Sequence, residues 1–134
     1  MADKVKVHCD GGSRGNPGPS ALGVVISTMK DEVIEEFGEF LGTQTNNYAE
    51  YSAVVAALKK LQELNLYDAD FYLDSELIVK QLNGVYKVKN PSMIELNTQV
   101  NELSKGINLT FTHVYRKDNK LADAMVNQVL DSHK

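Results

Sequence analysis

The chain has no tryptophan, a single cysteine, and no apolar run long enough to span a membrane. Because one cysteine cannot form an internal disulfide, we expect Cys9 to be a small buried side chain in a reducing cytoplasm. The start of the chain also lacks the apolar stretch of a signal peptide, so we expect a cytoplasmic protein with no membrane contact.

Basic residues are scarce as well. Fourteen Lys and Arg residues against 18 Asp and Glu residues give a net charge of -4, which argues against a broadly basic nucleic-acid binder but leaves room for local basic surfaces. The 134 residues, 43% of them hydrophobic and 24% charged, are typical of one globular domain. We therefore expect residues 1–134 to form a single domain with one core.

Hydrophobic patterning predicts an α/β protein in which three strands precede the first helix. Strands are expected at residues 4–9, 21–27, 33–40, 70–74 and 108–114. Helices are expected at about 45–64, 75–83, 91–104 and 120–131, the first of them capped by Thr45 or Asn46. Residues 10–20, which are rich in Gly, Pro, Asn and Ser, are expected to form a loop.

This order of elements constrains the topology. The first three strands are joined by short connections and should form an antiparallel meander. The first, fourth and fifth strands are separated by helices and should run parallel, with right-handed crossovers. Ligand sites in open sheets of this kind lie at the carboxyl ends of the parallel strands.

Four carboxylates stand at positions where a charge is costly. Asp10 and Asp74 each end a short apolar run, whereas Glu50 and Asp123 lie on the apolar faces of two predicted helices. Each alone could be an ordinary turn, cap or surface residue, but buried charges need compensation and their joint pattern is hard to explain otherwise. Two Mg2+ or Mn2+ ions would compensate four converging carboxylates and could support phosphoryl transfer. The leading interpretation is a metal-dependent phosphoryl-transfer site.

Four segments then point to a known family. They are DGGSRGNPGPS (10–20), TNNYAEYSAV (45–54), DSELIVKQLNG (74–84) and HVYRKDNKLADAMVN (113–127). In their order and spacing the chain resembles type 1 ribonuclease H, within the wider ribonuclease H-like family. The resemblance implies a five-stranded mixed sheet in the order 3-2-1-4-5, flanked by helices. It also implies that Asp10, Glu50, Asp74 and Asp123 are catalytic metal ligands, and that the substrate is an RNA/DNA hybrid whose RNA strand is cut to leave a 5′-phosphate and a 3′-hydroxyl.

Substrate contacts follow from the same resemblance. Ser13, Asn16, Asn46 and Asn47 match positions that contact the minor groove of the hybrid, where 2′-hydroxyls distinguish RNA from DNA. For Asn46 and Asn47 the alternative interpretation is helix capping. Thr45 matches a position that holds a phosphate of the DNA strand.

The chain departs from the family pattern at three places. Glu76 stands where a Gln is common, and its negative charge could weaken or redirect substrate contact. The Trp- and Lys/Arg-rich handle of some members is missing, and three lysines around residues 80–89 are equally compatible with phosphate contact and with a solvated surface. The loop before the last carboxylate is short, so His113 is expected to be structural, and Arg116 is the best-placed residue for phosphate contact or product release. Few basic residues imply weaker, salt-sensitive binding than in handle-bearing members.

Two other functions remain open at this stage. The acidic net charge and Glu76 slightly favour a non-catalytic nucleic-acid-binding module that keeps the fold. A nuclease acting on double-stranded RNA or on a DNA junction would share the metal chemistry, although the Asn-rich groove contacts favour a hybrid. Nothing in the sequence indicates an obligate protein partner.

Overall fold

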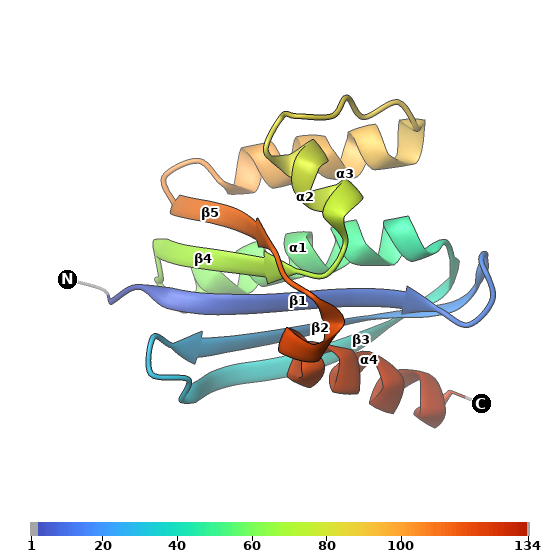
Figure 1. Cartoon of the computed structure of the whole chain (residues 1–134), viewed down its shortest axis with the longest axis horizontal. Helices are drawn as coiled ribbons and strands as arrows, with labels where there is room; N and C mark the ends of the chain where they lie inside the picture. The colour runs from blue at the N-terminus through green and yellow to red at the C-terminus, as the bar shows by residue number, and fades with distance from the viewer. Residues whose placement is uncertain (1–2, 134) are drawn as a thin grey trace.

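The computed structural model describes residues 3–133, which fold around one five-stranded sheet with helices on both faces (Figure 1). The strands are β1 (Val5–Ser13), β2 (Gly18–Thr28), β3 (Val33–Gln44), β4 (Asp68–Leu73) and β5 (Asn108–His113). The helices are α1 (Asn46–Glu63), α2 (Glu76–Leu82), α3 (Pro91–Leu103) and α4 (Lys120–Ser132), with a short 3-10 helix, η1 (Arg116–Asp118), before α4.

The strand order is β3-β2-β1-β4-β5, as predicted. β1 pairs antiparallel with β2, and β2 pairs antiparallel with β3, so the first three strands form the expected meander. β1 pairs in parallel with β4, and β4 with β5, because a helical crossover separates each pair. No helix within residues 3–133 is long and apolar enough to cross a membrane.

Helices cover the two faces of the sheet unequally (Figure 1). α1 packs on β1 and β2, and α3 packs on α1, whereas α4 packs on β1, β2 and β3 from the other face. Neighbouring residues of β1 show this division, since successive strand residues point to opposite faces. A side chain at Gly11 would meet the backbone of α1, and one at Gly12 would meet Val126 of α4.

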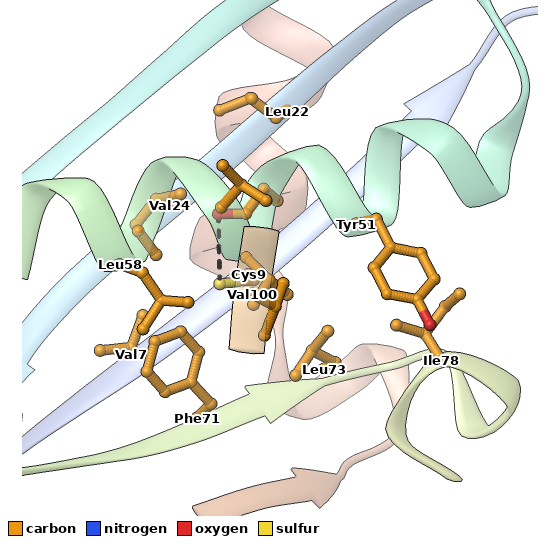
Figure 2. Packing of buried hydrophobic residues seen from close by; sticks show 14 of the residues in the cluster. Val7, Cys9, Leu22, Val24, Tyr51, Leu58, Phe71, Leu73, Ile78 and Val100 are labelled. Atoms are coloured by element: carbon orange, nitrogen blue, oxygen red, sulfur yellow. Dashed lines mark hydrogen bonds between the residues drawn. The ribbon is translucent and has the colours of Figure 1, made fainter. Parts of the chain in front are cut away.

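The main core lies between the sheet and α1. Figure 2 shows Val7 and Cys9 of β1 and Phe71 and Leu73 of β4 on the side of the sheet that faces α1. All four are fully buried, and burying an aliphatic or aromatic side chain of this kind stabilises the fold by roughly 1.5–3 kcal/mol. The Cys9 thiol donates a weak hydrogen bond to the Ala53 carbonyl of α1 at 3.8 Å, so the predicted buried position of Cys9 is confirmed.

Side-chain caps fix the starts of three helices. The Thr45 hydroxyl accepts a hydrogen bond from the backbone of α1 at 3.1 Å, and the Ser75 hydroxyl does the same for α2 at 3.3 Å. The Asn90 side chain caps α3, which begins at Pro91, a residue suited to a first turn. Of the two predicted caps for α1, Thr45 is therefore the one used.

The prediction of a loop over residues 10–20 is wrong. β1 continues to Ser13 and β2 begins at Gly18, so only residues 14–17 form the turn of a long hairpin. The pairing runs through Gly12↔Ala21 and Ser13↔Ser20, and β3 extends to Gln44 because it pairs with the added part of β2. Glycine makes a strand weak in isolation, but pairing with β2 supplies the hydrogen bonds that keep residues 10–13 extended. Asp10 therefore lies within β1 and does not end it.

Candidate active site

The strand register brings Asp10 and Asp74 together. The parallel pairing of β1 with β4 ends at Cys9↔Leu73. The two carboxylates come next along the chain, Asp10 still within β1 and Asp74 directly after β4. The prediction that they meet at one edge of the sheet is confirmed, although β1 runs on beyond this point to pair with β2 alone.

A close approach between α1 and β1 places Glu50 beside this pair. An added Cβ at Gly11 would lie 2.2 Å from the carbonyl carbon of Ala49, so only glycine lets the helix backbone come so near the strand. The side chain of the next helix residue, Glu50, then lies beside Asp10 and Asp74. Carboxylate oxygens of Asp10, Glu50 and Asp74 all lie within 4.8 Å of one another.

Burial and the repulsion between neighbouring carboxylates disfavour ionisation of Asp10, Glu50 and Asp74. Asp10 is 6% exposed and Glu50 is 7% exposed. Burial, followed by the charge of Asp74, raises the pKa of Asp10 to about 7. Burial, followed by the charges of Asp10 and Asp74, raises the pKa of Glu50 well above its ordinary value. Burial also raises the pKa of Asp74, against which the positive charge of Arg116 acts.

Asp123 approaches the group from the opposite face of the sheet. It lies in the first turn of α4. Gly23 lets this helix pack closely on β2, because a Cβ at that position would lie 2.4 Å from the Ala122 carbonyl oxygen. Asp123 is half-buried, and its side chain raises the pKa of Asp10. It is not one of the three carboxylates whose oxygens lie within 4.8 Å of one another, although it lines the same cleft.

The carboxylate group fits a divalent cation. One buried oxygen of Glu50 and one of Asp74 have no hydrogen-bond partner within residues 3–133. Unpaired buried charge is unfavourable, and clustered carboxylate oxygens are the donor set that hard cations such as Mg2+ prefer. The geometry is therefore that of an acidic group able to hold a metal ion.

A cleft of about 530 Å3 opens over these carboxylates. Among the residues predicted to bind substrate, Ser13, Asn46, Asn47 and Arg116 line it together with all four carboxylates. The Ser13 backbone N–H donates to the Asn46 side-chain oxygen at 2.7 Å, which ties the hairpin to the start of α1. Asn46 thus holds the hairpin and does not cap its own helix.

The other three predicted contacts lie outside the residues that line the cleft. The Asn16 side-chain oxygen accepts a hydrogen bond from the Asn46 backbone N–H at 3.1 Å, so Asn16 supports the rim. The Thr45 hydroxyl is occupied as the cap of α1. Glu76 is exposed at the start of α2, where its carboxylate accepts a hydrogen bond from Lys80 at 3.0 Å.

The structure also places the other residues at which the chain departs from the family pattern. Lys80 lies 5.0 Å from the centre of the Tyr86 ring as well as beside Glu76, whereas Lys87 and Lys89 are exposed between α2 and α3. His113 is the last residue of β5, as expected of a residue within the strand.

Two residues at the site were not singled out by the sequence analysis. Asn119 is 1% exposed, and its side-chain amide donates a hydrogen bond to the Cys9 carbonyl at 2.9 Å. A hydrogen bond from Asn119 also lowers the pKa of Asp74. Asn119 therefore joins Cys9 of β1 and Asp74, the residue after β4, to the start of α4. Arg14, in the hairpin turn, lines the cleft. An Asn directly before a helix is typical of a cap, but Asn119 makes no side-chain cap.

Comparisons with known sequences give one consistent family. A family model described as "Reverse transcriptase-like" matches residues 8–129. The chain is 38% identical to Ribonuclease HI of Halobacterium salinarum, over 96% of this chain and 65% of that protein. It is 37% identical to a bifunctional protein of Mycobacterium tuberculosis, over 96% of this chain and 36% of that protein. The chain thus spans about two thirds and about a third of the lengths of these relatives.

Solved structures agree with the sequence relatives. The crystal structure of RNase H1 from Halobacterium salinarum has a TM-score of 0.93 at 38% identity, covering 96% of this chain and 98% of that chain. LC11-RNase H1, solved in complex with an RNA/DNA hybrid, has a TM-score of 0.92 at 40% identity, again covering 96% and 98%. The five-stranded sheet and its helices are therefore shared with these nucleases.

Proposed function

This chain belongs to the type 1 ribonuclease H family, and from that membership we propose that it hydrolyses the RNA strand of RNA/DNA hybrids in a metal-dependent reaction. The products would be a 5′-phosphate and a 3′-hydroxyl. A relative of 40% identity and nearly equal length was solved with such a hybrid, which supports this substrate class.

One observation carries the proposal: three carboxylates converge within 4.8 Å in an open cleft, two of them with an unpaired buried oxygen. We propose that Asp10, Glu50, Asp74 and Asp123 hold two Mg2+ or Mn2+ ions. Ions bound there would activate a water and stabilise the leaving oxygen of the phosphodiester. A domain that only bound nucleic acid would gain nothing from burying these charges, so the intact set favours an enzyme.

The side chains around the carboxylates would position the hybrid. Ser13, Asn46 and Asn47 lie on the cleft wall and offer donors and acceptors that suit 2′-hydroxyl groups. Asn16 would act through Asn46, whose backbone it holds. The Thr45 hydroxyl accepts the cap bond of α1 and donates to no residue between 3 and 133, so it would bind a phosphate of the DNA strand.

Arg116 and Glu76 would act at the edges of the site. Arg116 lines the cleft, and its positive charge acts on Asp74, so it would hold a phosphate close to the carboxylates. Glu76 remains a predicted influence on substrate choice. Its exposed carboxylate is paired with Lys80 at 3.0 Å and lies outside the cleft lining, so we expect this influence to be small. We also propose a cytoplasmic location, which suits the free thiol of Cys9.

A substrate comparison tests this function. Labelled RNA/DNA hybrid, double-stranded RNA and double-stranded DNA are incubated with Mg2+ or Mn2+ and either the wild-type protein or Asp10→Asn. We expect the wild type to cut only the RNA of the hybrid and the variant to be inactive. Cleavage of double-stranded RNA at a similar rate would favour the alternative nuclease, and equal cleavage by the variant would remove Asp10 from the mechanism.

A further inference from the structure

We propose that Arg14 binds a backbone phosphate of the nucleic acid on the α4 side of the cleft, a role that rests on the proposed function. Arg14 lies in the four-residue turn between β1 and β2, and its side chain is 38% exposed. It lines the same cleft as the carboxylates. A positive side chain at this rim can therefore reach a bound strand.

The choice of basic residue in the cleft supports this role. The chain has 14 basic residues, of which only Arg14 and Arg116 are arginines, and both line the cleft whereas none of the lysines described does. Arginine presents planar donors that match phosphate oxygens in pairs, while lysine acts as a point charge. An excess of acidic residues and four carboxylates in the cleft would repel a polyanion. Two arginines at its rim would offset that repulsion locally.

The two arginines are linked to different carboxylates of the site. Arg116 acts on Asp74, at the end of β4, whereas Arg14 is connected to Asp123 on α4. The connection runs through Asn127, whose side-chain oxygen lies 3.5 Å from Arg14 Nη2 and whose amide donates to Asp123 Oδ2 at 3.3 Å. A phosphate bound by Arg14 would therefore lie one side chain away from a proposed metal ligand.

The guanidinium keeps donors for a ligand. Its contact with Asp131, at 2.7 Å, and its contact with Asn127 both use Nη2. Nε and Nη1 make no hydrogen bond to any residue between 3 and 133. Since a guanidinium carries five N–H donors, it can stay against α4 and bind a phosphate at the same time. Asp131 and Asn127 thus contact only one of the three guanidinium nitrogens, and the proposed phosphate contact does not depend on them.

The simpler interpretation is that Arg14 and Asp131 only fasten the hairpin turn to α4. Their side chains are 38% and 60% exposed, and ion pairs with this exposure contribute little to stability. A comparison of two variants distinguishes these interpretations. Asp131→Asn breaks the ion pair but keeps the cation, whereas Arg14→Gln removes both.

The experiment measures binding and turnover in parallel. Affinity for a labelled RNA/DNA hybrid is measured by fluorescence anisotropy at several salt concentrations, with Asp10→Asn in every sample to prevent cleavage. KM and kcat are measured without that substitution. The variants are Arg14→Gln and Asp131→Asn, and the control is Lys30→Gln, which removes one exposed positive charge from the β2–β3 turn, outside the cleft.

We expect Arg14→Gln to weaken hybrid binding about tenfold and to lower the slope of log affinity against log salt by roughly 0.7–0.9, the loss of one phosphate contact. KM should rise with kcat nearly unchanged. Asp131→Asn and Lys30→Gln should change affinity less than about twofold.

Two results would overturn the assignment: equal weakening by Arg14→Gln and Asp131→Asn, or no change in affinity and salt slope with Arg14→Gln. A failure of the proposed function is visible separately. In that case the unsubstituted protein would not cut the hybrid under any condition, and the role of Arg14 would fall with it.

Discussion

Replacing Asp10 with asparagine should make the metal-free protein more stable at pH 8, although it removes a proposed metal ligand. Asp10 is 6% exposed, and burial and the charge of Asp74 raise its pKa from an ordinary 3.8 to about 7. The folded protein therefore holds this proton in a range where the unfolded chain has released it. Stability must fall as the pH rises from about 4 to about 7, and the loss is complete above pH 7.

The pKa sets the size of the effect. At about 1.4 kcal/mol for each pH unit, the cost of ionising Asp10 in the folded protein is at most about 4 kcal/mol at pH 8. For a chain of this length that corresponds to a rise in Tm on the order of 10 °C for Asp10→Asn. Near pH 4 the two proteins should have similar stability, since Asp10 is then protonated in the folded wild type.

Thermal unfolding followed by circular dichroism, in the presence of a chelator, measures the difference at both pH values. Adding Mg2+ at pH 8 should then stabilise the wild type and narrow the gap, because metal binding to the folded state offsets the repulsion. A variant less stable than the wild type at pH 8, or a stability difference that does not depend on pH, would refute the claim that Asp10 is held in an unfavourable, metal-requiring site.

Three further substitutions test the surroundings of the carboxylates. Gly11→Ala should cost at least about 1–3 kcal/mol in urea unfolding and abolish cleavage, since the new Cβ would lie within 2.3 Å of the α1 backbone. Gly12→Ala should be much milder, because its Cβ would meet only one methyl of Val126 at 3.4 Å, and equal effects would contradict this packing. Asn119→Ala should lower the free energy of unfolding by about 1–3 kcal/mol because it leaves a buried carbonyl of β1 unpaired, and an unchanged unfolding curve would show that this link is dispensable. Glu76→Gln should change hybrid affinity less than about twofold, because this carboxylate is exposed and outside the cleft lining; a several-fold gain in anisotropy measurements would place it at the groove.

The carboxylate site could be predicted because its signals are local. Asp10 and Asp74 follow apolar runs that read as strands, and Glu50 shares a helical face with small and apolar residues. Parallel strands have their carboxyl ends at one edge, so two of the four positions follow from the order of elements alone. The helix faces suggested that Glu50 and Asp123 could point to the same edge, and the family resemblance implied the same four ligands. For three of the four the structure brings the oxygens together.

The extended conformation of residues 10–13 could not be predicted from composition. Gly11 and Gly12 favour turns when considered alone, but here Gly11 admits the α1 backbone and β2 pairs with the whole segment. The secondary structure of a glycine-rich segment depends on the elements that pack against it. The local sequence pattern does not indicate which elements these are.

The roles of Asn119 and Arg14 depend on contacts across the fold. Asn119 bonds to Cys9, 110 positions away, and Arg14 meets Asp131 at the other end of the chain. Neither pair forms a periodic or motif-like pattern. Only the docking of α4 on the sheet brings these partners within hydrogen-bonding distance.

The most direct test of the central claim is the rate of RNA-strand cleavage in a labelled hybrid, measured against Mg2+ and Mn2+ concentration for the wild type and Glu50→Gln. The buried charge of Glu50 serves no purpose in the fold that glutamine would not serve, so the variant should fold at least as well as the wild type. We predict that wild-type cleavage rises from none without metal and that Glu50→Gln loses it at every concentration while remaining folded. Cleavage without metal, or a metal response that Glu50→Gln leaves unchanged, would contradict the account.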